Sequence, residues 1–400
     1  MRVLYHHRTR GTDAQRVHIL EIVNAFRELG HEVRIASLIA TEEQNAAREA
    51  SEAGWKKIAR KIPMTYEAIQ LAYNAVGLPW LLWESVSFRP DFIYERYSLF
   101  CFAGVLAAKL TGKPIVLEVN SPFALEQTRD GEIRLPRFAA WLERLICNSA
   151  SKVIVVSGPL RRILLDAGVR PEKLMLVPNG INPEHLAACG SRDELRAQCG
   201  LNERIVIGFV GWFKPWHGLE FLIEAFLDSG LAARGAALLL VGDGPAMAPM
   251  REMVARRNAT ADVVFSGPIE HERIPAYLHL MDIAVQPAAN EYCCPMKIIE
   301  YMGVGKPVIA PRQENIQELL PEDAAMLFEP GNAADLVRAM AAVVESAELR
   351  QSLGRRAEQV VWSRGLLWSA NAAKTIETLR QAGSLQAAPP SLPEPRVGQS

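Results

Sequence analysis

The feature that most constrains the fold is a regular alternation of short apolar segments with helical patterns along the first half of the chain. Short apolar segments indicate strands, and apolar residues repeated every three or four positions indicate helices. Strands connected through helices form parallel sheets with helices on both faces. The expected elements are strands at 3–6, from 33, at 90–96, 115–119 and 153–156, and helices at 19–29, 103–110 and 138–150.

The alternation restarts after a cluster of turn-forming residues at 178–183. A chain of 400 residues exceeds the usual size of one hydrophobic core, so two α/β domains are expected, at 1–185 and 195–362. We place the linker at about 183–200. The second domain is expected to hold strands at 205–210, 237–241, 263–266, 283–286, 308–310 and 326–328, with helices at 219–227, 274–280, near 298, at 315–319 and from 332.

The composition favours a globular enzyme. Hydrophobic residues make up 49% of the chain and the formal net charge is -1, which gives no electrostatic basis for a nucleic-acid partner. The six cysteines show no Cys-x-x-Cys spacing, so we expect reduced thiols in the cytoplasm. The chain begins with a strand pattern rather than a signal peptide, and no apolar run approaches transmembrane length.

The segment 292–309 places a lysine and a glutamate on one short helix between two loops. Pro295 suits the first turn of this helix and Gly303 suits its exit. Lys297 and Glu300 then share a face. Free amides at a helix N-terminus favour a diphosphate, and a carboxylate one turn deeper can accept hydrogen bonds from a ribose. The alternative is an ordinary surface helix with a Lys/Glu pair.

A second loop, at 211–218, follows a strand and precedes a helix. Gly211 permits close approach of a ligand to the backbone, and Lys214 can neutralise a leaving phosphate. This composition suits a pyrophosphate, although a tryptophan-rich packing loop is the alternative. His217 by itself is more often structural.

Two further turns follow strands of the second half and give weaker support. Gly242 lies in a glycine-rich turn, and Pro268 follows a strand end that could present backbone groups to a base. The glycine turn serves only as support, and a plain strand-to-turn exit explains the segment with Pro268 at least as well.

In the first half, the loop 6–18 carries three arginines and three histidines ahead of a helix. In two facing doubly wound domains, ligands bind between the carboxyl ends of the strands, so this loop would face the same cleft. Gly11, Arg16 and His18 are candidates for holding an anionic acceptor or the outer phosphate. The alternative is a solvated basic loop.

Glu118 and Asn120 lie at the end of another strand and are candidates for contact with the reacting sugar. Glu118 could equally be structural.

Several other chemistries lack their motifs in this sequence. There is no Gly-x-Ser-x-Gly elbow, no His-Glu-x-x-His helix and no phosphate loop of the Gly-x4-Gly-Lys-Ser/Thr type. There is also no Asp-x-Asp to hold a divalent metal with a nucleotide diphosphate. We therefore expect no metal and no cofactor.

Taken in order, five segments resemble the family-4 retaining glycosyltransferases: 18–33, 177–181, 211–218, 241–244 and 300–308. The resemblance covers about 1–380 and is specific through order and spacing. It implies the α/β GT-B fold, in which two facing Rossmann-like doubly wound domains enclose a deep interdomain cleft. It also implies a final helix at about 366–380 that crosses back to the first domain. The tail at 383–400 has a composition typical of disorder.

Under this resemblance, Glu300 matches the motif glutamate that binds the nucleotide ribose, whereas the family's first motif glutamate falls on Tyr292. The usual Arg and Lys of the phosphate loop fall on Trp212 and His217, and the usual strand-end His falls on Asn120. Lys214, and Lys297 with it, would supply the lost charge. The implied donor-binding residues are Gly211, Trp212, Gly242, Pro268, Tyr292, Cys294, Met296, Lys297, Ile298 and Glu300, and the implied catalytic residues are Lys214, His217 and Asn120.

The implied reaction moves a sugar from a nucleoside diphosphate to a glycan or lipid-linked acceptor with retention of configuration. The departing phosphate itself would deprotonate the acceptor hydroxyl. Lys214 and His217 would stabilise the negative charge that develops on the β-phosphate, so Lys214→Ala is expected to lower turnover roughly 100-fold. Two alternatives stay open: a GT-B epimerase or hydrolase of nucleotide sugars, and a non-catalytic nucleotide-sugar-binding partner of a glycan-assembly complex.

A basic stretch at 55–63 and an apolar, tryptophan-bearing run at 78–83 indicate peripheral contact with the inner face of a membrane. The alternative is a helix packed on the first domain with a solvated basic face. If the contact exists, the acceptor is expected to be lipid-linked, as in bacterial cell-surface polysaccharide synthesis.

Overall fold

The computed structural model describes residues 1–9, 14–38, 64–187 and 190–385. Its first domain is built on a parallel six-stranded sheet of order β2-β1-β3-β4-β5-β6. The four inner strands are buried along most of their length, as expected where helices cover both faces of a sheet, whereas the two edge strands are mostly exposed or half-buried. The strands are β1 (Arg2–His6), β2 (Glu32–Ala36), β3 (Phe92–Arg96), β4 (Ile115–Val119), β5 (Lys152–Val155) and β6 (Leu174–Leu176).

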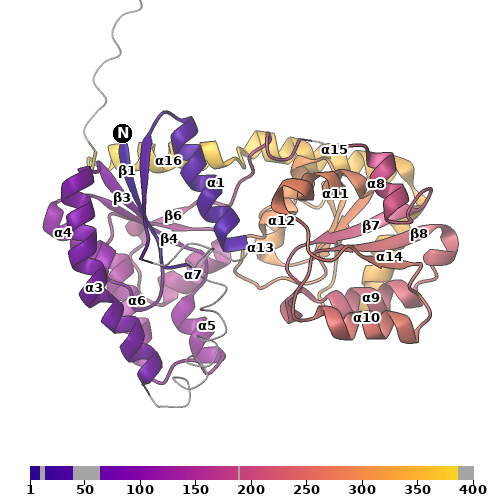
Figure 1. The fold of residues 1–400 in the computed structure, drawn as a ribbon, viewed down its shortest axis with the longest axis horizontal. Helices are drawn as coiled ribbons and strands as arrows, with labels where there is room; N and C mark the ends of the chain where they lie inside the picture. Colours follow the sequence, from indigo (N-terminus) through magenta and orange to yellow (C-terminus); the bar gives the residue numbers. More distant parts are fainter. Residues whose placement is uncertain (10–13, 39–63, 188–189, 386–400) are drawn as a thin grey trace, which may run out of the picture.

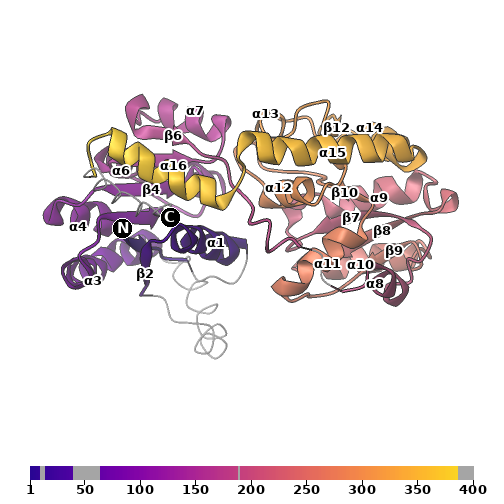
Figure 2. The same cartoon turned by 90° about the horizontal axis from the view of Figure 1, so that it is seen from above.

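Helices cover both faces of the first sheet (Figure 2). One face packs against α3 (Thr65–Phe88), α4 (Ala103–Thr111), α6 (Pro136–Ser149) and α7 (Gly158–Asp166), whose apolar residues share one core cluster with the sheet. The other face packs against α1 (Ala14–Glu28) and α16 (Trp368–Gln381). The short α5 (Phe123–Arg129) precedes α6.

The second domain repeats this design with a parallel sheet of order β12-β11-β10-β7-β8-β9. Its strands are β7 (Ile205–Val210), β8 (Ala236–Val241), β9 (Val263–Phe265), β10 (Ile283–Val285), β11 (Val308–Pro311) and β12 (Ala325–Phe328). One face packs against α9 (Leu219–Asp228), α10 (Met247–Arg256) and α14 (Ala333–Glu345). The other packs against α8 (Arg192–Gln198), α11 (Ile274–Leu280), α12 (Met296–Gly303) and α15 (Ala347–Arg364). The short α13 (Glu314–Gln317) faces α7 of the first domain.

The chain crosses between the domains twice, and the two crossings run side by side. Gly365 ends α15 in a left-handed conformation with φ 61°, and α16 then returns to pack on α1 of the first domain (Figure 1). Ile181 and Leu367 form a parallel bridge where the crossings meet. A Cβ at Gly180 would lie 2.5 Å from the carbonyl carbon of Leu367, so this close approach requires glycine.

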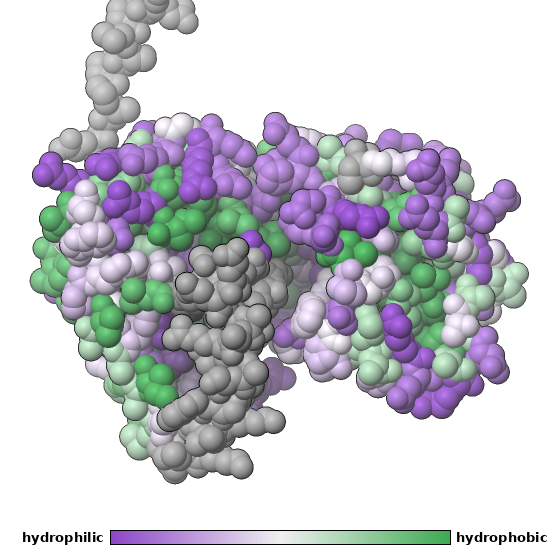
Figure 3. Space-filling view, in the orientation of Figure 1, coloured by the Kyte–Doolittle hydropathy of each residue, from purple (hydrophilic) through white to green (hydrophobic). Residues whose placement is uncertain are grey.

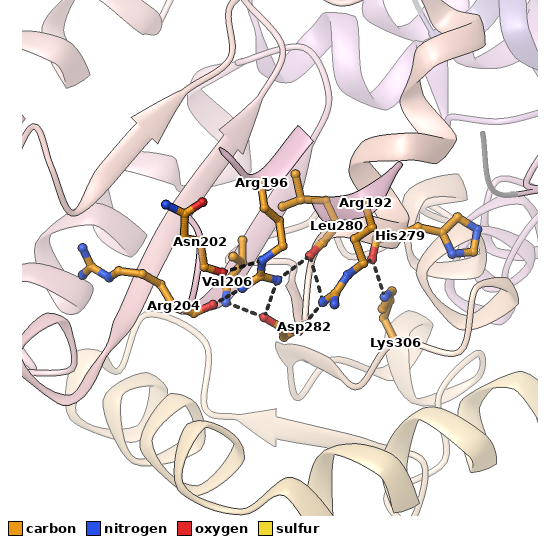
Figure 4. A network of polar contacts seen from close by, with 9 residues as sticks. All are labelled: Arg192, Arg196, Asn202, Arg204, Val206, His279, Leu280, Asp282 and Lys306. Atoms are coloured by element: carbon orange, nitrogen blue, oxygen red, sulfur yellow. Dashed lines mark hydrogen bonds and ion pairs between the residues drawn. The ribbon is translucent and has the colours of Figure 1, made fainter. Parts of the chain in front are cut away.

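The structure agrees with the expected pair of doubly wound domains and with the returning helix. It differs at 183–200, expected to be a linker, because this stretch contains α8. Arg196 of α8 bonds Asp282 at 3.2 Å and the carbonyl of Asn202 at 2.8 Å, while Arg192 bonds Asp282 at 2.6 Å (Figure 4). Asp282 also accepts from the amide of Val206, so these bonds fasten α8 to the amino edge of the second sheet.

The basic stretch 55–63, the tail from 386 and Gly11 lie outside the described residues. Among the helices that the structure describes, none is both long and apolar enough to cross a bilayer.

Candidate functional site

The loops that follow β7 and β8 meet the start of α12 at the carboxyl edge of the second sheet. Gly211 has φ 148°, and a Cβ there would lie 2.9 Å from Nζ of Lys297. Gly242 has φ 127° and packs directly against the backbone of Gly211. Its amide donates to Oγ of Ser266 at 3.1 Å, which ties in the loop after β9. Glycines at both turns therefore leave open backbone beside a lysine.

Lys297 brings its ammonium group to the loop 211–218, which follows β7. Its Nζ lies 3.4 Å from Nε2 of His217 and 4.2 Å from the ring centroid of Phe209. Burial lowers the pKa of Lys297 to about 8, against the attraction of Glu300. Burial and the charge of Lys297 lower the pKa of His217 to about 3. A partly desolvated cation beside a neutral imidazole is a site prepared for an anion.

Glu300 lies one turn further along α12. Burial raises its pKa to about 7, Lys297 opposes this shift, and Glu21 of α1 in the first domain adds to it. Glu21 accepts from Nδ1 of His185 at 2.7 Å. Glu300 is thus a partly buried carboxylate at the junction of the two domains, with the capacity to accept hydrogen bonds from hydroxyl groups.

Lys214 lies on the exposed side of the loop 211–218. Its Nζ is 5.3 Å from the ring centroid of Trp216, which is 53% exposed. Trp212 is 47% exposed, and Pro268 is exposed as well. Lys297 therefore supplies the ammonium group that contacts His217, whereas Lys214 lies over an exposed indole ring.

The segment before α12 is joined to the first domain. Asn179 donates from its main-chain nitrogen to Sγ of Cys294 at 3.2 Å and from its side chain to the carbonyl of Cys294 at 2.8 Å. Met296 packs against the core of the first domain, which holds α1 and α16. Ile298 is fully buried between α12 and the second sheet, so its side chain has a packing role.

Tyr292 stands where the first motif glutamate was expected, and it reaches across to the first domain. Its hydroxyl donates to Glu126 of α5, and its carbonyl accepts from Oγ of Ser157 at 2.7 Å. A further contact joins the domains nearby, where Arg162 of α7 pairs with Glu314 of α13. Tyr292 thus joins the segment before α12 to the first domain through Glu126 and Ser157.

Glu118 is the centre of a buried polar cluster at the carboxyl edge of the first sheet. It bonds His18 at 2.9 Å, Tyr94 at 2.9 Å, Arg96 at 3.3 Å and Asn120 at 2.5 Å. Burial alone would raise its pKa, but His18, Arg96 and Asn120 lower the pKa to about 2. Glu118 is therefore ionised, and its hydrogen bonds hold the side chains of Arg96 and Asn120 at the ends of β3 and β4.

His18 links this cluster to the second domain. Its Nε2 lies 3.1 Å from Oδ1 of Asn179, which in turn bonds Cys294. Of the other residues expected on this side, Arg16 is exposed on the first turns of α1. The cluster therefore connects the first-domain strand ends with the segment that leads into α12.

His6, Glu95 and Cys101 form a buried group with potential metal-ligand atoms within 4.8 Å of one another. Nδ1 of His6 lies 2.6 Å from Glu95 and its Nε2 lies 3.1 Å from the hydroxyl of Tyr73. Both ring nitrogens thus have partners within the protein. The expectation that the protein needs no metal stays a prediction.

Comparison with protein families assigns both domains. A model described as Glycosyltransferase Family 4 matches residues 15–185, and one described as Glycosyl transferases group 1 matches residues 204–346. The chain belongs to the family-4 glycosyltransferases. These matches confirm the family resemblance seen in the sequence, and they place the two halves of the glycosyltransferase on either side of the first crossing.

Curated relatives of this glycosyltransferase include the alpha-D-kanosaminyltransferase of Streptomyces kanamyceticus, 24% identical over 64% of this chain and 68% of the relative. The 2-deoxystreptamine glucosyltransferase of the same organism is 28% identical over 62% of this chain and 67% of the relative. The sulfoquinovosyl transferase SQD2 of Arabidopsis thaliana is 24% identical over 84% of this chain and 65% of the relative.

The solved structure of Anabaena HepE in complex with UDP-glucose superimposes with a TM-score of 0.73 at 18% identity, and the match covers 95% of this chain and 100% of that one. Sucrose-phosphate synthase from Thermosynechococcus elongatus gives a TM-score of 0.70 at 18% identity, over 96% and 100% of the two chains. These likenesses confirm the GT-B fold of this glycosyltransferase.

Sequence reasoning did not single out three residues that connect the site of this glycosyltransferase. Asn179 was noted only within a turn and within the family segment 177–181, although an Asn before Gly180 at a domain crossing is a usable signal. Glu21 follows His18 by three positions, which places both on one face of α1. Glu126 carried no local signal, because its partner Tyr292 lies 166 residues away.

Proposed function

We propose that this glycosyltransferase moves a sugar from a nucleoside-diphosphate sugar to a glycan or lipid-linked acceptor, with retention of anomeric configuration and without a metal ion. The observation that carries the proposal is the position of Lys297, whose Nζ lies 3.4 Å from Nε2 of His217 beside the open backbone of Gly211. A cation at the start of a helix and next to a glycine turn is suited to a diphosphate.

The donor lies across the carboxyl edge of the second sheet. Its diphosphate faces Lys297 and the backbone at Gly211, and its ribose hydroxyls donate to Glu300. The ammonium group supplies the positive charge that a divalent metal supplies in other transferases. The nucleotide complexes of HepE support a nucleotide sugar as the donor class.

The chemical step is a front-face displacement. The bond between the anomeric carbon and the phosphate oxygen breaks, and the acceptor oxygen forms its bond on the same face of the sugar. The proton of the acceptor hydroxyl passes to the departing β-phosphate. Lys297 stabilises the negative charge that develops on that phosphate, and His217, which is neutral at pH 7, accepts from Lys297 through Nε2 and holds the ammonium group in place. The first-domain cluster around Glu118 positions Asn120 beside the sugar.

The acceptor belongs to the synthesis of bacterial cell-surface polysaccharide, and the reaction takes place in the cytoplasm at the inner face of the membrane. The names of two relatives, a 2-deoxystreptamine glucosyltransferase and a sulfoquinovosyl transferase, show that the transferred sugar differs within the family.

The proposal is tested by donor turnover. Purified protein is incubated with UDP-, GDP-, ADP- and dTDP-sugars in the presence of EDTA, and release of nucleoside diphosphate and the anomeric form of any product are followed by NMR. Slow hydrolysis of one donor, lost in Lys297→Ala and Glu300→Ala, supports the proposal. Tight donor binding without turnover for every acceptor would instead indicate a non-catalytic binding partner.

A further inference from the structure

Helix α3 exposes an uncharged apolar face along its whole length. Ile69, Val76, Trp83 and Val86 are 53%, 63%, 62% and 69% exposed, although the opposite side of the helix is buried. Alanines and a proline fill the positions between them on the exposed side. A helix on the surface of a globular domain usually turns polar residues outward, and contiguous exposed apolar area of this kind marks an interaction site.

The two acids of α3 do not interrupt this face. Glu67 is buried and accepts from the main-chain nitrogens of Arg134 and Leu135 at 2.5 and 3.3 Å. Glu84 pairs with Arg34 of β2 at 3.3 Å. Both carboxylates are therefore used within the first domain.

The neighbouring helices extend the apolar face and add positive charge. Helices α3, α4 and α6 lie in one layer over the same side of the first sheet (Figure 2). Trp141 and Leu145 of α6 are 47% and 46% exposed. Arg137 and Arg144 are exposed on the same helix, and Lys109 is exposed on α4. Apolar patches are visible over the region of α3 and α4, whereas the surface is recessed between the two domains (Figure 3).

We propose that this face, made by Ile69, Val76, Trp83 and Val86 of α3 with Trp141 and Leu145 of α6, docks on an anionic lipid bilayer. Exposed aliphatic and tryptophan side chains enter the interfacial region of a bilayer, and arginine and lysine at the rim attract anionic headgroups. A second copy of the chain fits less well. A twofold symmetric pairing would bring the same arginines of both copies to one interface.

The inner side of α3 explains how docking would serve the transferase. Tyr73 lies 3.1 Å from Nε2 of His6, and Gln70 accepts from Arg8 at 2.9 Å. The turns of α3 that expose Ile69 and Val76 therefore hold the carboxyl end of β1. A bilayer on the outer side would lie about one helix diameter, roughly 10 Å, from that edge. The inference rests on the proposed function only in assuming that the acceptor is lipid-linked.

The test is flotation of the full chain with vesicles of phosphatidylcholine alone or with phosphatidylglycerol added. Wild type is expected to float with the anionic vesicles, and Ile69→Ser/Val76→Ser/Trp83→Ser is expected to lower the partition coefficient roughly tenfold or more. Arg137→Glu/Arg144→Glu should weaken binding to anionic vesicles only. The matched control is Trp362→Ser, because Trp362 is also 53% exposed but lies on α15 of the second domain.

Thermal midpoints of all variants verify that they fold, and the single variant Trp83→Ser replaces the triple variant if that one is unstable. Wild type that stays unbound, a triple variant that floats like wild type, or an equal loss in Trp362→Ser would each overturn the proposal. A dimer of wild type in analytical sedimentation that only the triple variant abolishes would also overturn the proposal, because a second copy of the chain would then cover the face of α3 and α6. Donor hydrolysis measured without vesicles tests the catalytic site alone. Failure of the transferase proposal can therefore be distinguished from failure of the membrane-docking proposal.

Discussion

Nζ of Lys297 lies 3.4 Å from Nε2 of His217, although the two residues are 80 positions apart in the chain. His217 stands where the family resemblance leads one to expect a lysine. Lys297 on α12 thus brings an ammonium group to the position at which the family usually has the lysine of the loop after β7.

Lys297→Ala is expected to lower kcat/KM for the donor roughly 100-fold, because one lost charge on the developing phosphate costs about 3 kcal/mol. Lys214→Ala, for which the sequence alone predicted a 100-fold loss, is now expected to cost roughly tenfold or less. Its amine rests on the exposed ring of Trp216, where solvent weakens its effect. Steady-state kinetics of both variants check this order, and equal losses, or a larger loss in Lys214→Ala, would count against it.

Donor binding is expected to be linked to proton uptake. Burial lowers the pKa of Lys297 to about 8, and an adjacent diphosphate favours the charged form and raises that pKa again. At pH 8 Lys297 should take up roughly half a proton when the donor binds. Near pH 6 Lys297 is already protonated and should take up almost none. Affinity therefore falls as the pH rises above about 8. Calorimetry in buffers of different ionisation enthalpy measures the uptake, and Lys297→Met should abolish it.

Restoring the family glutamate at Tyr292 is expected to impair the enzyme. The hydroxyl of Tyr292 donates to Glu126, so Tyr292→Glu places two carboxylates together at the domain junction. We expect a several-fold lower kcat/KM, and recovery when Glu126→Gln is added. Tyr292→Phe serves as the control that removes the bond without adding charge. A gain of activity in Tyr292→Glu would show that the junction tolerates the family residue.

Glu118→Gln is expected to destabilise the first domain by about 3 kcal/mol at pH 7, because a buried charge network loses its anion. The folded-state pKa of Glu118 is lowered to about 2 from its usual 4.5. Its stabilising contribution is therefore present above pH 4.5 and is lost as the pH falls towards 2. Urea unfolding of wild type and variant should show a difference that shrinks below pH 4.5. A constant difference over that range would assign the effect to packing instead of charge.

The fold was largely predictable because its strands are short, apolar and separated by helical periodicity. β4 and β7 are buried on both faces; β7 is a continuous apolar run, and β4 is apolar except for Glu118. Helix α3, which contains 78–83, was offered only as an alternative, because it is apolar nearly all round and lacks the amphipathic period by which a helix is detected. α8 was absorbed into the expected linker, since seven residues after a turn cluster carry little periodic signal.

The site was predictable where it depends on local order in the chain. Lys297 and Glu300 were placed together because they lie on one turn of α12, and the glycine turns mark where backbone is open. The contacts between distant segments were not predictable. No local pattern indicates that Lys297 meets His217, that Tyr292 meets Glu126, or that Asn179 joins Cys294 to His18.

The most direct measurement compares the affinity of the protein for nucleoside diphosphates and monophosphates of the same base, using wild type and Lys297→Ala. UDP, GDP, ADP and dTDP are each paired with their monophosphates in isothermal titration calorimetry with EDTA. Wild type is expected to prefer one diphosphate over its monophosphate roughly tenfold or more, and Lys297→Ala to lose most of that preference. An unchanged preference in the variant, or no binding of any diphosphate by wild type, would contradict the assignment of Lys297 to the phosphate site.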